Sequence, residues 1–245
     1  MNFIVDALVQ PVITASIEAM LWSAIIAGIA GQTLGGFGRE YYLGYALWAN
    51  FLGRVTTNWM YEFNMHSDIE TGQINSILMR PISFYGYYLA QFMGYKVFVA
   101  ACSFMIPITA CWMIGASMNV ARLPLVLLLV IYFLVFVHTL SFCVACMTFF
   151  INRASSLTGI KNITMWILAG ELIPLDLYPE PFRSWLIYLP FSAGVYIPVG
   201  YITGRFGSEV VWQSFASVTV GLVVVGALAK IMWRRGLQAY TGTGA

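Results

Sequence analysis

The chain has 245 residues, of which 60% are hydrophobic and only 9% are charged, and its formal net charge at pH 7 is +2. An ordinary soluble domain has roughly 25% charged residues, so this chain has too little polar side chain to cover a water-facing surface. The small net charge and the lack of a basic block exclude a nucleic-acid-binding protein. Composition therefore predicts an all-α polytopic membrane protein.

The first three predicted membrane spans occupy residues 12–31, 42–61 and 87–113. Each is an apolar run of the length that a helix needs to cross a bilayer, about 20 residues. A charge at the bilayer centre costs roughly 2.5–3.5 kcal/mol on insertion scales, so Glu18 in the first span and Arg54 in the second are expected to face protein or water. They either pair across neighbouring antiparallel spans or line a cavity, and the sequence leaves both possibilities open.

A polar stretch at residues 64–83 separates the second and third predicted spans. Its apolar residues recur at the near-helical spacing of a short amphipathic helix on a membrane surface, at Ile69, Ile74, Ile77 and Leu78. Gly72 permits a turn, and Pro81 is expected to end the helix before the next span. Arg80 is either a partner for a carboxylate on a soluble protein or for lipid phosphate, or simply a positive anchor of a polar loop.

The remaining predicted spans cover residues 125–150, 156–172 and 210–233. Between the fifth and sixth, five prolines interrupt the apolar segment 171–204, which predicts a re-entrant or interfacial hairpin rather than a seventh span. Glu171, at the start of this hairpin, either shapes an exit gate or marks the membrane interface.

The distribution of basic residues predicts that both termini lie in the cytoplasm. Seven basic residues then lie inside and four lie outside, which is the direction of the positive-inside rule. The inside group is Arg80, Lys96, Arg153, Lys161, Lys230, Arg234 and Arg235, and the outside group is Arg39, Arg122, Arg183 and Arg205. In this orientation the stretch 64–83 is cytoplasmic and the hairpin 171–204 is extracellular.

Reactive side chains form no catalytic pattern in the sequence. His138 and Ser141 lie in the fourth predicted span, where no acid is available nearby to orient the histidine. Cys143 and Cys146 have CxxC spacing, but their apolar surroundings predict packing rather than metal binding. No GxxxxGK[ST] sequence occurs, so the chain has no P-loop. We therefore expect a protein that is not an enzyme and binds no cofactor itself.

Three motifs occur in a fixed order along the chain. Residues 69–81 match the pattern I..G.[IL]...L.RP, residues 170–191 read GELIPLDLYPEPFRSWLIYLPF, and the last predicted span ends in WRRGLQAY. Together they resemble the ABC-2 type permeases of ABC transporters, in which the first motif marks the coupling helix that docks into an ATPase subunit. The resemblance implies that this role falls to Ile69, Glu70, Gly72, Ile74, Leu78, Arg80 and Pro81.

The resemblance further implies the membrane subunit of an ATP-driven exporter, a single domain of six spans over residues 1–245 in a bacterial plasma (inner) membrane. The implied partners are two cytoplasmic P-loop ATPase subunits, which carry the ATP and Mg²⁺, a second permease subunit, identical or related, and membrane lipid. Glu18, Arg54 and Glu171 are the candidate pathway residues, and the 16% aromatic content suits an amphipathic or lipid-like substrate. The alternative is a stand-alone secondary transporter or channel, for which Glu18 is the only candidate coupling carboxylate.

Overall fold

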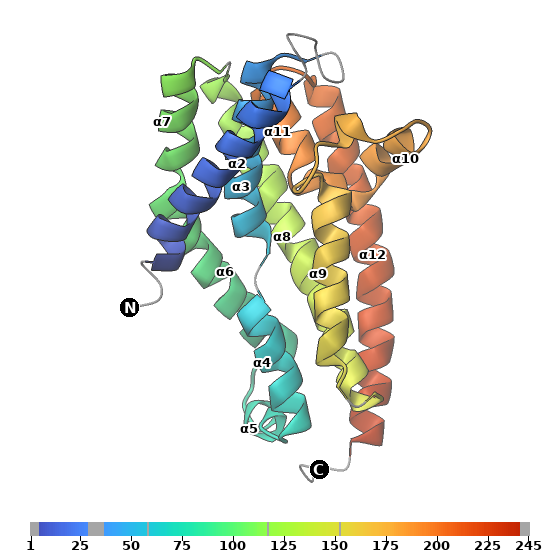
Figure 1. Ribbon diagram of the computed structural model, residues 1–245. Coiled ribbons are helices and arrows are strands. Elements are labelled where there is room, and N and C mark those ends of the chain that lie inside the picture. The colour runs from blue at the N-terminus through green and yellow to red at the C-terminus, as the bar shows by residue number, and fades with distance from the viewer. Residues whose placement is uncertain (1–4, 29–36, 58, 117, 152, 241–245) are drawn as a thin grey trace.

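The computed structural model describes residues 5–28, 37–57, 59–116, 118–151 and 153–240, and within these ranges the secondary structure is helical. The long helices stand side by side in one elongated bundle (Figure 1). Helices α4 and α5 and the C-terminal end of α12 lie at one end of the bundle, and α10 and α11 lie toward the other. This arrangement agrees with the all-α fold that the composition predicts.

The N-terminal part of the chain is a pair of antiparallel helices. A π-helical turn, η1 (Val5–Val9), leads into α2 (Gln10–Gly28), which packs along α3 (Arg39–Thr56). Helix α2 corresponds to the first predicted span, and residues 29–31 of that prediction lie outside the described part of the chain. Most of α2 is exposed, whereas α3 is buried along almost its whole length.

The second predicted span, residues 42–61, is not one continuous helix. Helix α3 stops at Thr57, whose backbone is extended (φ −112°, ψ 137°), and α4 (Trp59–Glu70) begins two residues later. Lys96, from α6, donates hydrogen bonds to the backbone carbonyl of Arg54 at 2.5 Å and to that of Thr57. The last carbonyls of a helix need partners, and the Lys96 ammonium supplies one where α3 ends.

The third predicted span consists of two consecutive helices, α6 (Phe84–Ser103) and α7 (Met105–Ile114), after the short α5 (Ile74–Leu78). Helix α6 begins at Ser83, whose hydroxyl accepts a hydrogen bond from the Gly86 N–H at 3.0 Å, an N-cap that satisfies one free backbone donor. Helix α7 ends at Gly115, which has left-handed backbone angles.

Two long apolar helices form the other side of the bundle. Helix α8 (Leu123–Ala145) lies between the short helices η2 (Val120–Arg122) and η3 (Cys146–Phe149), and it packs along α12 (Ser208–Ala239). Helix α9 (Ser155–Ala169) is shorter and ends at the left-handed Gly170. The segment 171–204 that follows α9 is divided into four short helices: η4 (Leu175–Leu177), α10 (Phe182–Tyr188), η5 (Pro190–Ala193) and α11 (Tyr196–Ile202).

Four helical stretches of the described chain are long and apolar enough to cross a membrane: Gln10–Gly28, Phe84–Ile114, Val120–Phe149 and Ser208–Ala239. They correspond to the first, third, fourth and sixth predicted spans. Helix α3, in the place of the second, has 18 residues and contains Arg39, Glu40 and Arg54. Helix α9, in the place of the fifth, has only 15 residues. The second and fifth predicted spans thus correspond to a helix that carries charges and a helix that is short.

Candidate functional site

Helices α4 and α5 meet in a tight turn at one end of the bundle (Figure 1). Gly72, between them, has φ of +78°, a left-handed conformation that glycine adopts without the steric cost of a Cβ. The hydroxyl of Tyr88 on α6 donates a hydrogen bond of 2.6 Å to Asp68 Oδ2 on α4. The turn is therefore fixed against the adjoining long helix.

The residues of the 69–81 motif divide between the core and the surface of this turn. The side chains of Ile69 and Ile74 are buried, and Ile77 is buried beside them. The exposed members of the motif are Glu70, Leu78, Arg80 and Pro81. Between them Met79 is 83% exposed. The turn thus presents an apolar and charged surface at the end of the molecule while its isoleucines hold it to the core.

A buried polar network, here called the Glu62 cluster, joins α4, α8 and α9 near the start of α4. It consists of Glu62 on α4, Ser141 on α8, and Lys161 and Asn162 on α9. Glu62 pairs with the Lys161 ammonium and accepts hydrogen bonds from Ser141 Oγ at 2.5 Å and from Asn162 Nδ2 at 3.0 Å. Glu62 is 1% exposed and Lys161 is 9% exposed.

His66 adds a second polar link one turn further along α4. Its Nδ1 lies 2.6 Å from Thr148 Oγ1 of η3, and its Nε2 lies 2.9 Å from Thr158 Oγ1 of α9. Burial lowers the pKa of His66 to about 4, and the nearby Lys161 charge acts in the same direction. The imidazole is therefore neutral at pH 7, with one nitrogen donating and the other accepting.

These contacts make α4 and α9 a mechanically linked pair. Removing one partner of a buried ion pair typically costs about 3–5 kcal/mol, because the other charge stays buried without compensation. A displacement of α4 against α9 separates Glu62 from Lys161 and breaks the His66 contact with Thr158. Motion of the α4–α5 turn is consequently transmitted to α9 unless the cluster breaks.

The sequence interpretation missed this cluster. From the sequence, Lys161 is counted only among the basic residues on the cytoplasmic side, whereas the structure buries its ammonium against Glu62. Lys96, assigned to the same group, is 2% exposed. One signal was available, since Lys161 lies within the fifth predicted span, where a cation requires a partner. Glu62 and Asn162 carried no comparable signal, because neither stands out from a membrane-interface sequence.

Glu18 and Arg54 each have an amide partner on the opposite helix of the α2–α3 pair. Asn50 Nδ2 on α3 donates a long hydrogen bond of 3.4 Å to Glu18 Oε1. Arg54 Nη2 donates one of 3.1 Å to Gln10 Oε1 at the start of α2. Both residues therefore lie at the helix–helix contact, as expected for charges within apolar segments.

Glu171 joins the same region from the chain after α9. Its carboxyl group lies against Gly53 of α3, where the Cβ of any other residue would collide with it. The carboxylate also lies within electrostatic range of Glu18, Lys96 and Arg54. The three residues predicted for the pathway thus gather where α2, α3 and the end of α9 meet.

A second ion pair fixes the segment 171–204 to the beginning of α3. Arg205 pairs with Asp176, which also accepts hydrogen bonds from Tyr196 Oη at 2.7 Å and Tyr41 Oη at 2.9 Å. The Arg205 guanidinium lies 4.4 Å from the ring centroid of Phe37, within the range of a cation–π contact. Sequence reasoning also missed this cluster, since its members are separated by long stretches of chain.

Other reactive side chains are placed as packing residues. His138 is fully buried, and its Nε2 lies 3.1 Å from the Tyr85 carbonyl oxygen. The four cysteines, including Cys143 and Cys146, are free. In the described part of the chain no group of three His, Cys, Asp or Glu side chains is arranged to hold a metal ion.

Comparison with known proteins gives one match. A protein family described as "ABC-2 family transporter protein" matches residues 12–244, a range that includes the α4–α5 turn and both ion-pair clusters. No curated protein and no solved structure matches the chain.

Proposed function

Because the chain belongs to the ABC-2 family of transporter proteins, we propose that it is the permease subunit of an ATP-driven ABC exporter. It is an integral membrane component, and a separate cytoplasmic ATPase subunit binds and hydrolyses ATP with Mg²⁺. The complete complex contains two ATPase subunits and a second permease, identical or related. The chain crosses a bacterial inner membrane six times, with α3 and α9 as the second and fifth crossings and both termini in the cytoplasm.

The α4–α5 turn is the observation that carries this proposal. Its exposed face combines the apolar Leu78 and Met79 with the charged Glu70 and Arg80. Such a surface fits the anatomy of a protein interface, in which an apolar centre is bordered by polar groups. It lies at the same end of the bundle as the basic C-terminal part of α12 (Figure 1). We infer that the ATPase docks here.

The pathway runs beside α2, α3 and α9, where Glu18, Arg54 and Glu171 gather. ATP binding closes the two ATPase subunits and displaces the α4–α5 turn. Through the Glu62 cluster this displacement reaches α8 and α9, and the interface between the permease halves opens toward the outside. The abundant aromatic side chains suit an amphipathic or lipid-like substrate.

Copurification from the native source tests the proposal. The detergent-solubilised chain should carry a P-loop ATPase, and Arg80→Glu should lower the amount of ATPase recovered about tenfold, because the reversed charge opposes its partner carboxylate. Arg183→Glu is the matched control, since Arg183 is a partly exposed arginine of α10, toward the other end of the bundle.

Two results would contradict the proposal. The first is a complex from the native source without any ATPase. The second is sustained transport by the lone chain in liposomes without ATP, which would favour a secondary transporter or channel.

A further inference from the structure

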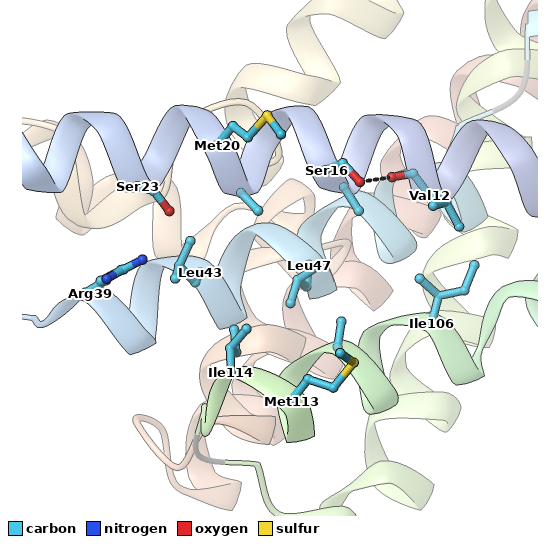
Figure 2. Close-up of a pocket in the computed structure, with 13 residues that line it drawn as sticks. Val12, Ser16, Met20, Ser23, Arg39, Leu43, Leu47, Ile106, Met113 and Ile114 are labelled. Atoms are coloured by element: carbon cyan, nitrogen blue, oxygen red, sulfur yellow. Dashed lines mark hydrogen bonds between the residues drawn. The ribbon is translucent and has the colours of Figure 1, made fainter.

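An apolar groove runs along the bundle between α2, α3 and α7 (Figure 2). Its volume is about 610 Å³, within the range of roughly 300–1,000 Å³ that is usual for small-molecule sites. Leu43 and Leu47 of α3 form its floor, and Ile106 and Ile114 of α7 form one wall. Met20 lies on the opposite wall, on α2, where it is 72% exposed.

The groove has one polar end. Arg39 is the only charged side chain among the thirteen residues that line it, and Figure 2 shows it beside Leu43 with Ser23 nearby on α2. Within the described part of the chain, Arg39 is exposed and has no ion-pair or hydrogen-bond partner. Glu40, the next residue, does not line the groove. Among the described residues, Arg39 is therefore a positive charge without a protein partner at one end of the apolar groove.

We propose that this groove binds an anionic membrane phospholipid, with its phosphate at Arg39 and an acyl chain along α2, α3 and α7. Guanidinium binds phosphate oxygens through two parallel hydrogen bonds, which are stronger than neutral ones. The headgroup of a zwitterionic lipid also carries a cationic group, which would lie near Arg39. No Asp or Glu lines the groove to pair with that cation. The groove therefore selects an anionic headgroup.

The lipid is a resident component rather than transported cargo. All walls of the groove belong to a single chain, so binding needs neither the ATPase nor a second permease. The occupied groove shields apolar side chains of α2 that packing within the chain leaves exposed. The site depends only on insertion of the chain into a membrane, so it stands independently of the proposed function.

Photochemical cross-linking tests this site. The chain is reconstituted in phosphatidylcholine nanodiscs that contain a small fraction of phosphatidylglycerol with a diazirine on its acyl chain. Cross-links should concentrate on the groove residues of α2, α3 and α7. Arg39→Gln should lower their yield about tenfold, which is the effect of losing one charged hydrogen-bonded contact. Arg183→Gln, the control, should leave the yield unchanged. Met113→Trp, at an exposed lining position, should reduce it by occupying space.

Three outcomes would overturn the proposal. Cross-links spread evenly over the exposed apolar side chains of α12, such as Val223 and Val224, would indicate ordinary surrounding lipid. An unchanged yield in Arg39→Gln would remove the role of the guanidinium. Equal labelling of the groove by the phosphatidylcholine analogue would remove the headgroup selectivity.

Discussion

Glu62 and Lys161 form an ion pair that is almost completely withdrawn from solvent, with side-chain exposures of 2% and 7%. Desolvation of two charges offsets most of their attraction, so the intact pair contributes little net stability. The pair instead fixes the positions of the helices, because both groups make further hydrogen bonds. Asn162 donates to the other oxygen of Glu62, and the ammonium of Lys161 donates to Ser141 Oγ. These bonds hold α4 at one position relative to α8 and α9.

The intact pair contributes little stability, but the loss of one partner is costly, and this difference gives a first prediction. Lys161→Met leaves the Glu62 carboxylate buried without a cation and should lower the free energy of unfolding by about 3–5 kcal/mol. Adding Glu62→Gln removes the second charge and should recover most of that loss. Thermal unfolding of the purified variants in one detergent measures both effects.

The control for this prediction is Arg183→Met on α10, which breaks a partly exposed ion pair with Glu180 and should change stability little. A double variant as unstable as Lys161→Met alone would show that the loss comes from packing rather than from an uncompensated charge.

The sequence predicted which charged residues lie inside the bundle, but it did not predict their hydrogen-bond partners. Glu18 and Arg54 stood out because charges within apolar runs are costly, and the structure places both at the α2–α3 contact. Their partners Asn50 and Gln10 depend on how two helices rotate against each other. Uniformly apolar helix faces do not encode that rotation, so the partners were not predictable.

Two helices of the bundle end in the same manner. Helix α7 ends at Gly115 (φ +72°) and α9 ends at Gly170 (φ +77°), both in the left-handed conformation. Around Gly115 no atom lies within 4 Å of the place where a Cβ would be, whereas Gly170 is closely surrounded by Tyr45, Leu175 and Tyr196. Tyr45 Oη also donates a hydrogen bond of 2.6 Å to the Gly170 carbonyl.

An alanine at Gly115 would meet only the strain of a left-handed backbone, whereas an alanine at Gly170 would also collide with neighbouring side chains. This difference gives a second prediction. Gly115→Ala should cost about 1 kcal/mol of stability, the price of a left-handed alanine alone. Gly170→Ala should cost more, because its methyl group also displaces the Tyr45 hydroxyl. Thermal unfolding measures the stability of both variants. An equal loss of stability in the two would show that the neighbours of Gly170 add no cost.

At the level of elements, the sequence located the most apolar helices well. The fourth span, predicted over residues 125–150, corresponds to the apolar stretch Val120–Phe149. The break between α3 and α4 is not predicted by the sequence, because Lys96, which bonds the carbonyls there, lies 42 residues away from Arg54. Helix periodicity within the segment continues through the break and gives no sign of it.

The whole molecule has two chemically different ends. One end carries the α4–α5 turn and the last turn of α12, and the other part carries the helices of the segment 171–204 (Figure 1). The six crossings that we propose would place these two regions on opposite sides of the membrane, with the turn in the cytoplasm.

Thiol labelling checks this topology and is the third prediction. Single cysteines replace Met79 (83% exposed) and Trp185 (74% exposed) in a background without the four native cysteines. A membrane-impermeant reagent should label Trp185→Cys in intact cells and Met79→Cys only after permeabilisation. Labelling of both positions in intact cells would rule out the six-span arrangement.

The cap that Lys96 places on α3 makes the junction at Thr57 a pivot. Because the Lys96 ammonium bonds the carbonyl of Arg54 within α3, we expect α4 to tilt about Thr57 without unravelling α3. At 1.5 Å per residue, Glu62 lies roughly 5 Å and Glu70 roughly 16 Å from the first residue of α4. If α4 rotates as a rigid helix about the junction at Thr57, a displacement of Glu70 therefore moves Glu62 about a third as far. The force applied at Glu70 then acts on the Glu62 cluster about three times as strongly.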